Sequence, residues 1–162
     1  MIRAIFLDVD GTLISFSTHE IPASALRALA QAHERGVRLF IATGRAANDL
    51  GPLEGIPYDG VVSLNGARCV ANDGRVVSLH PIPRADFERA LALSEEQDFA
   101  MGLELEEGVF VNRVTPDVER VAHMVAHPVP EQTDLRELFG RVECCQLCFY
   151  FDAETQRRVM TE

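Results

Sequence analysis

Lysine is absent from this 162-residue sequence, in which all 15 basic residues are arginines. The 25 acidic residues leave a formal net charge of −10 at pH 7. A chain so short of positive charge is not expected to bind nucleic acid, because phosphate backbones require basic patches. No apolar run is long enough to cross a bilayer, and no basic-then-apolar leader precedes the first predicted strand. We therefore expect a cytoplasmic protein with neither a nucleic-acid nor a membrane partner.

Cysteine is scarce as well. The sequence holds four cysteines: Cys69, Cys144, Cys145 and Cys148. They are too few and too clustered to form the disulfide framework of a small secreted domain. A zinc site built from Cys145, Cys148 and two histidines is an alternative. The strand predicted at residues 143–151 argues against it, because positions three apart on a strand point to opposite faces. We expect the cysteines to be small core residues.

The first 66 residues alternate between apolar runs and amphipathic segments. Strands are predicted at residues 2–8, 36–45 and 60–66, and helices at residues 21–35 and 46–50. Strand and helix alternating at this spacing are typical of parallel βαβ units with right-handed crossovers. The fold class expected for this part is therefore α/β, with a parallel sheet.

The pattern changes after Gly66. Two hairpins are predicted, one turning at residues 72–74 and the other at residues 107–108. Helices are predicted at residues 83–97 and 115–127. We therefore expect two domains: an α/β core over residues 1–67 and an α+β domain over residues 68–162.

Polar residues follow each of the three predicted parallel strands, where ligands bind in sheets of this kind. They are Asp8, Asp10, Thr43, Gly44, Arg45 and Asn65. Asp8 and Asp10 share a face by the strand period, so their charges repel unless a cation or a shared proton stabilises both. Mg²⁺ fits such oxygen ligands. The alternative is an aspartate-capped turn, although an Asx-turn requires only one aspartate.

These segments resemble the motifs of a known family. DVDGTL at residues 8–13 is similar to motif I of the haloacid dehalogenase (HAD) superfamily, and FIATGR at residues 40–45 to its motif II. SLNGA at residues 63–67 resembles the segment that precedes the cap in the Cof-type subfamily. The resemblance covers essentially the whole chain, as part of a Rossmann-type core followed by most of an α+β cap. It implies a Mg²⁺-dependent phosphomonoester hydrolase acting on a small phosphorylated metabolite, most typically a sugar phosphate.

The resemblance also implies roles for individual residues. Asp8 would be the nucleophile that forms an aspartyl-phosphate, and Asp10 the general acid and base. The Asp8 carboxylate and the Asp10 main-chain carbonyl would hold Mg²⁺. Thr43 and Gly44 would bind a phosphoryl oxygen, while Arg45 and Asn65 would either reach the substrate or brace the loop. Residues 13–20 would form a flap over the site.

The sequence departs from the family pattern after the cap. Members of the family carry a motif III lysine or arginine and a motif IV acidic pair, whereas this sequence has no lysine and no GDxxxD-like segment after residue 66. We therefore expect weak or absent phosphatase activity from the chain alone. The alternative function is that of a catalytically incompetent, truncated homologue that binds a phosphorylated ligand or a partner chain. The strand at residues 2–8 would be an exposed edge, covered in a homodimer or by a missing C-terminal segment.

Overall fold

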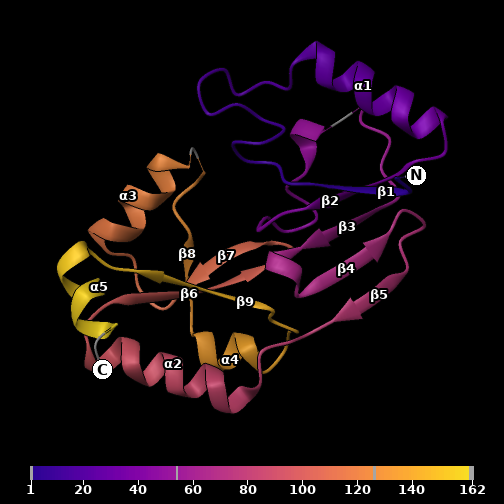
Figure 1. Cartoon of the computed structure of the whole chain (residues 1–162). Helices are drawn as coiled ribbons and strands as arrows, with labels where there is room; N and C mark the ends of the chain where they lie inside the picture. Colours follow the sequence, from indigo (N-terminus) through magenta and orange to yellow (C-terminus); the bar gives the residue numbers. More distant parts are fainter. Residues whose placement is uncertain (1, 54, 126, 161–162) are drawn as a thin grey trace. The chain divides into compact units, whose positions relative to one another are not determined.

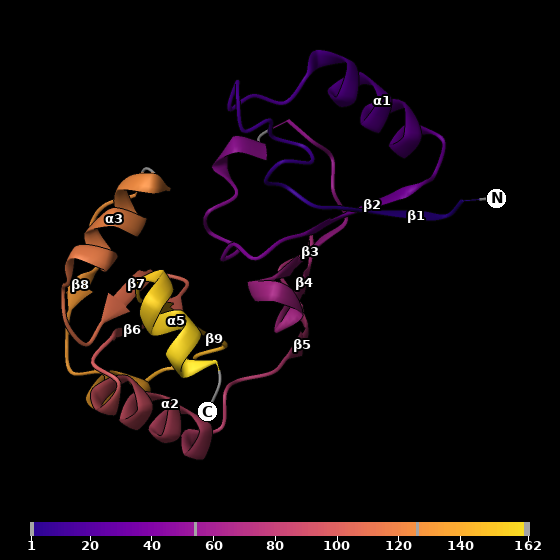
Figure 2. The same cartoon turned by 60° about the vertical axis from the view of Figure 1, so that its left-hand side comes forward.

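The computed structural model describes residues 2–53, 55–125 and 127–160. The chain divides into two compact units at the junction between His80 and Pro81 (Figures 1 and 2). The fold is mixed α/β with a parallel-rich sheet in the first unit, which confirms the predicted class. None of the helices in the described part of the chain is both long and apolar enough to span a membrane.

The first unit is a five-stranded sheet in the order β1-β2-β3-β4-β5. Its elements are β1 (Ala4–Leu7), α1 (Ala23–Glu34), β2 (Arg38–Ala42), η1 (Gly51–Leu53), β3 (Gly60–Ser63), η2 (Leu64–Gly66), β4 (Arg68–Ala71) and β5 (Val76–Leu79). Strands β1, β2 and β3 run parallel, and β4 and β5 are added antiparallel. The carboxyl ends of three successive parallel strands therefore meet at one edge of the sheet.

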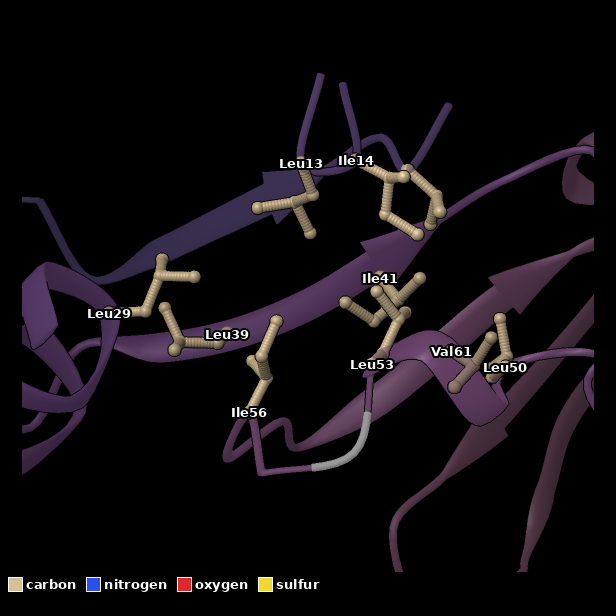
Figure 3. Close-up of a cluster of buried hydrophobic side chains, with 10 residues drawn as sticks. Leu13, Ile14, Leu29, Leu39, Ile41, Leu50, Leu53, Ile56 and Val61 are labelled. Atoms are coloured by element: carbon tan, nitrogen blue, oxygen red, sulfur yellow. The ribbon is translucent and has the colours of Figure 1, made fainter. Parts of the chain in front are cut away.

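One face of this sheet carries the core of the first unit (Figure 3). Leu39 and Ile41 of β2 are fully buried, and Leu29 of α1 packs against the same cluster. Helix α1 follows Pro22 at its N-cap and stops before Gly36, whose φ of 81° is the left-handed conformation that favours glycine at this position. The burial of alternate strand residues holds the strand ends in a fixed position.

Strand β1 forms one edge of the sheet, since β2 is its only partner among the described strands. Phe6 stacks on Phe40 of β2 with ring centroids 4.9 Å apart, yet it remains 62% exposed. Ile2, just before the strand, is 71% exposed. An edge with such apolar side chains and no charged residue within the strand can pair with additional polypeptide.

Two sequence predictions differ from this structure. The domain boundary lies after His80 and not at residues 67–68, because β4 pairs antiparallel with β3 and so extends the first sheet. Residues 46–50 do not form a helix. The Asp49 N–H donates to the Ala46 carbonyl at 3.1 Å, which closes a turn there.

The second unit packs helices against a four-stranded sheet in the order β8-β7-β6-β9. Its elements are α2 (Arg84–Glu96), β6 (Ala100–Leu105), β7 (Gly108–Val111), α3 (Pro116–Met124), β8 (Glu131–Gln132), α4 (Leu135–Phe139), β9 (Gln146–Tyr150) and α5 (Ala153–Val159). Phe87 of α2 stacks on Phe139 of α4, with ring centroids 4.1 Å apart, above the buried Met101 and Leu103 of β6. Strand β7 pairs antiparallel with β6 and parallel with β8.

The cysteines are free thiols. Cys144 is buried, and the Cys148 thiol donates to the Glu104 carboxylate over 3.6 Å. Burial raises the pKa of Cys148 to about 12, so this thiol stays protonated and unreactive at neutral pH. Within the described ranges, no three His, Cys, Asp or Glu side chains gather as metal ligands.

Candidate active site

The chain turns sharply just after β1, and this turn presents the two aspartates. Val9 is 1% exposed, while Asp8 and Asp10 on either side of it are exposed, so both carboxylates point away from the core. The Val9 carbonyl accepts the N–H groups of the three residues at positions 12–14, at 3.3, 3.0 and 2.9 Å. Gly11 makes this turn with a φ of 77°, a conformation that other residues rarely adopt.

Asp8 keeps one carboxylate oxygen available. The Thr12 hydroxyl donates to Oδ2 of Asp8 over 2.8 Å. The residues described supply no other partner to this side chain, and Asp8 is solvent-exposed. Oδ1 is therefore free to bind a cation or to attack an electrophile.

The Asp10 carboxylate, in contrast to that of Asp8, accepts hydrogen bonds on both of its oxygens. Nε and Nη2 of Arg45 donate to its two carboxylate oxygens at 2.9 and 2.8 Å, a bidentate arrangement. Nη1 of the same guanidinium donates to the Asp49 carboxylate and to the Asp49 carbonyl, each at 3.2 Å. Arg45 holds the pKa of the Asp10 carboxyl below its ordinary value, mainly through these hydrogen bonds; burial opposes this shift, and the charge of the guanidinium adds a smaller lowering effect.

The loop after β2 holds Thr43 nearly buried, at 6% exposure. The Thr43 N–H donates to the Val62 carbonyl at 2.9 Å, which fixes the loop to β3. The Thr43 hydroxyl oxygen accepts the Arg45 N–H at 3.1 Å. Because this oxygen accepts, the hydroxyl proton is still available for donation to a ligand.

The turn after β3 braces the same loop. Leu64, Asn65 and Gly66 all have positive φ, at 49°, 55° and 95°. The Leu64 and Asn65 N–H groups donate to the carbonyls of Arg45 and Thr43, at 3.1 and 3.2 Å. The Asn65 side chain lies directly over Gly44, because a Cβ placed on Gly44 would come within 3.1 Å of its Oδ1. Of the two roles expected for Asn65, bracing the loop is the one with a visible contact.

The residues around Asp8 suit a divalent cation held by few protein ligands. The Asp8 carboxylate has a free oxygen, and no donor among the described residues reaches the Asp10 main-chain carbonyl. Both oxygens of the Asp10 side chain, in contrast, are occupied by Arg45. The arrangement fits Mg²⁺ bound by one carboxylate and one carbonyl, with the remaining positions left to water or phosphate.

Sequence reasoning gave no role to Asp49, and it placed Thr12 and Phe16 only within longer segments, the DVDGTL motif and the flap expected at residues 13–20. Thr12 belongs to the quoted DVDGTL segment, so its proximity to Asp8 could have been expected from a tight turn. Asp49 lies four residues after Arg45, but the segment is not helical, so the usual i,i+4 argument does not predict this ion pair.

The fold and these strand ends define a class of hydrolase. A family model of haloacid dehalogenase-like hydrolases matches residues 5–162, and the chain belongs to this family. The resemblance seen in the sequence motifs is thereby confirmed.

Solved structures and a curated relative agree with this assignment. The chain is similar to BT1666 from Bacteroides thetaiotaomicron, described among phosphatases of the HAD superfamily, with 54% identity, a TM-score of 0.92, and coverage of 99% of this chain and 60% of that one. It is similar to BT4131, a HAD subclass IIB sugar phosphatase, with 28% identity, a TM-score of 0.82, and coverage of 98% and 62%. YkrA of Bacillus subtilis (strain 168), named as a candidate phosphatase, is 30% identical over 95 residues, which are 58% of this chain and 36% of YkrA. The chain therefore spans less than two thirds of the length of these relatives.

Proposed function

We propose that this chain contributes the nucleophile half of a Mg²⁺-dependent phosphomonoester hydrolase that acts on a small phosphorylated metabolite. The observation that carries the proposal is the exposed Asp8 carboxylate, oriented by Thr12 at the carboxyl end of β1, with one oxygen free. Family membership supports the reaction type. The likeness to BT4131, a sugar phosphatase, supports a sugar phosphate as the substrate.

In this mechanism, the free oxygen of Asp8 attacks the phosphorus of the ester. The bond from phosphorus to the ester oxygen breaks, and the alcohol leaves with a proton from Asp10. Water then attacks the aspartyl-phosphate, gives a proton back to Asp10, and releases phosphate with Asp8 regenerated. A Mg²⁺ ion held by the Asp8 carboxylate and the Asp10 carbonyl would neutralise charge between nucleophile and phosphate.

The remaining predicted residues have supporting roles in the proposal. The Thr43 hydroxyl donates to a phosphoryl oxygen, and the Gly44 N–H assists from the same loop. Arg45 favours the ionised form of Asp10, which is the form that accepts a proton from water. For the step in which Asp10 acts as an acid, the bidentate pair has to open and Asp10 has to take up a proton.

A second function is favoured by two observations. The chain has no lysine, and its described residues contain no group of three or more acidic, His or Cys side chains around a metal position. A site with so few groups to stabilise the charge of the transition state can bind a phosphorylated ligand without hydrolysing it. The exposed edge strand β1 adds a surface on which a second copy or a further polypeptide segment can pair.

Turnover and binding separate the two functions. We expect slow hydrolysis of glucose 6-phosphate by the chain with Mg²⁺, abolished in Asp8→Asn and unchanged in Asp86→Asn, a matched change on the exposed surface of α2. Phosphate release measures the reaction, and thermal unfolding with orthophosphate measures binding. Stabilisation by orthophosphate without turnover would support the second function, and activity that survives Asp8→Asn would rule out the first.

A further inference from the structure

Phe16 is an aromatic side chain that is 74% exposed, in the loop between β1 and α1 (indigo in Figure 1). The loop is anchored at its start, because Leu13 and Ile14 are 6% and 7% exposed and belong to the core of the first unit (Figure 3). It also closes on itself. The Ser15 N–H donates to the Glu20 carbonyl at 3.3 Å, and the His19 N–H donates to the Ser15 carbonyl at 2.8 Å.

The ring of Phe16 lies against the backbone of Gly11. A Cβ placed on Gly11 would come within 2.5 Å of Cε2 and 3.0 Å of Cζ of the ring. Gly11 is bonded on one side to Asp10 and on the other to Thr12, whose hydroxyl holds Asp8. The exposed ring is therefore next to the turn that carries both aspartates.

A single exposed phenylalanine is common on protein surfaces and by itself indicates nothing. Phe16 is distinguished by its neighbour. It covers a glycine that could carry no side chain in this arrangement, it stays outside the core cluster, and it leaves its free face to solvent. An aromatic face in this position is suited to contact the C–H face of a ring carried by a bound phosphate ester.

We propose that Phe16 is a specificity-determining residue, which forms an apolar wall for the leaving group of the phosphate ester and favours leaving groups with an apolar ring face over small ones. This inference rests on the proposed function, since it places the phosphoryl group at Asp8. Of the bound phosphate ester, the Phe16 ring contacts only the leaving group and not the phosphoryl group. Its removal should therefore weaken the binding of a hexose phosphate and leave the binding of the phosphoryl group unchanged.

Calorimetric titration with Mg²⁺ tests this without requiring turnover. The probes are orthophosphate, methyl phosphate and glucose 6-phosphate. In Phe16→Ala we expect the dissociation constant of glucose 6-phosphate to rise about tenfold, because the apolar contact between the phenylalanine ring and the sugar is lost. The dissociation constants of orthophosphate and methyl phosphate should stay within about twofold of their wild-type values. Phe16→Tyr, which keeps the ring, should restore the affinity. Phe149→Leu, a change at another exposed phenylalanine in the second unit, is the control and should alter none of the three constants.

The outcomes distinguish this inference from the proposed function. Equal weakening of all three ligands in Phe16→Ala would mean that the side chain only supports the Gly11 turn, and no change for glucose 6-phosphate would mean that the ring does not touch the ligand. Either result would overturn the inference and leave the proposed function standing. If wild type binds none of the three ligands while it remains folded by circular dichroism, the proposed function fails and the inference fails with it.

Discussion

Asp8 and Asp10 are two residues apart, but their partners give them different chemistry. Asp8 accepts one hydrogen bond from a neutral hydroxyl and is exposed, whereas Asp10 accepts two from a guanidinium that is itself fixed by Asp49. The motif in the sequence predicts that both carboxylates follow β1. It does not predict their partners, because Arg45 is 35 residues away along the chain and reaches Asp10 only after β1 and β2 have paired.

The Arg45–Asp10 pair gives stability a definite pH dependence. Because the folded-state pKa of Asp10 is lowered, the pair stabilises the fold above the unfolded-state pKa of about 3.9, and this contribution is lost as the pH falls through the folded-state value. We expect Arg45→Met to raise the pKa of Asp10 in a carboxyl-detected NMR titration. We also expect Arg45→Met to lower stability at pH 7 by no more than about 1 kcal/mol, because the pair is partly exposed to solvent.

The same measurements on Arg120→Met provide the control, since Arg120 pairs with Asp117 on the surface of α3. That variant should leave the pKa of Asp10 unchanged. An Asp10 pKa that does not move when Arg45 is replaced would show that the pair does not persist in solution.

At the scale of elements, hydrophobic pattern predicts the parallel strands, the hairpins and the long helices, because each buries a regular set of apolar side chains. It fails at residues 46–50, where Nη1 of Arg45 donates to the Asp49 carbonyl and no helix forms. It also fails at η2, where Leu64 and Asn65 adopt positive φ. Local propensity disfavours that conformation for Leu64, and the hydrogen bonds to the loop after β2 maintain it.

The turn after β1 allows the contact between Gly11 and Phe16 to be measured. Gly11→Ala and Gly36→Ala both place an alanine at a φ near 80°, which costs about 1–2 kcal/mol. Gly36 has nothing within 4 Å of the added Cβ, whereas at Gly11 the Cβ meets the Phe16 ring. In urea denaturation we expect Gly11→Ala to be the more destabilising of the two.

The additional destabilisation by Gly11→Ala relative to Gly36→Ala should disappear when Gly11→Ala is combined with Phe16→Ala. The ring is then absent, while the cost of the positive φ remains. If Gly11→Ala and Gly36→Ala destabilise equally in the presence of Phe16, the ring does not rest on this glycine in solution.

At the scale of the whole molecule, the chain covers 60% and 62% of the solved structures of BT1666 and BT4131, and its first sheet ends in an apolar edge strand, β1, with β2 as its one partner among the described strands. We propose that β1 pairs with further polypeptide, either a second copy or an additional segment. Because Ile2 and Phe6 are exposed, we expect the isolated chain to self-associate as its concentration rises.

Light scattering over a range of concentrations measures this. Phe6→Lys should shift the chain toward the monomer, because a lysine on an edge strand opposes strand pairing. Val77→Lys, on the exposed strand β5 at the opposite edge, is the control for added charge. A wild-type chain that is monomeric at every concentration would contradict the proposal of pairing with a second copy, and equal effects of the two lysines would show that β1 is not the interface.

In the proposed function, the Asp8 carboxylate accepts a phosphoryl group with Mg²⁺ beside it. Beryllofluoride, which binds to a carboxylate as a phosphoryl group does, tests this directly by fluorine NMR in the presence of Mg²⁺. We expect a bound signal for the wild-type chain that requires Mg²⁺ and is lost in Asp8→Asn. A bound signal of equal intensity in Asp8→Asn would contradict it.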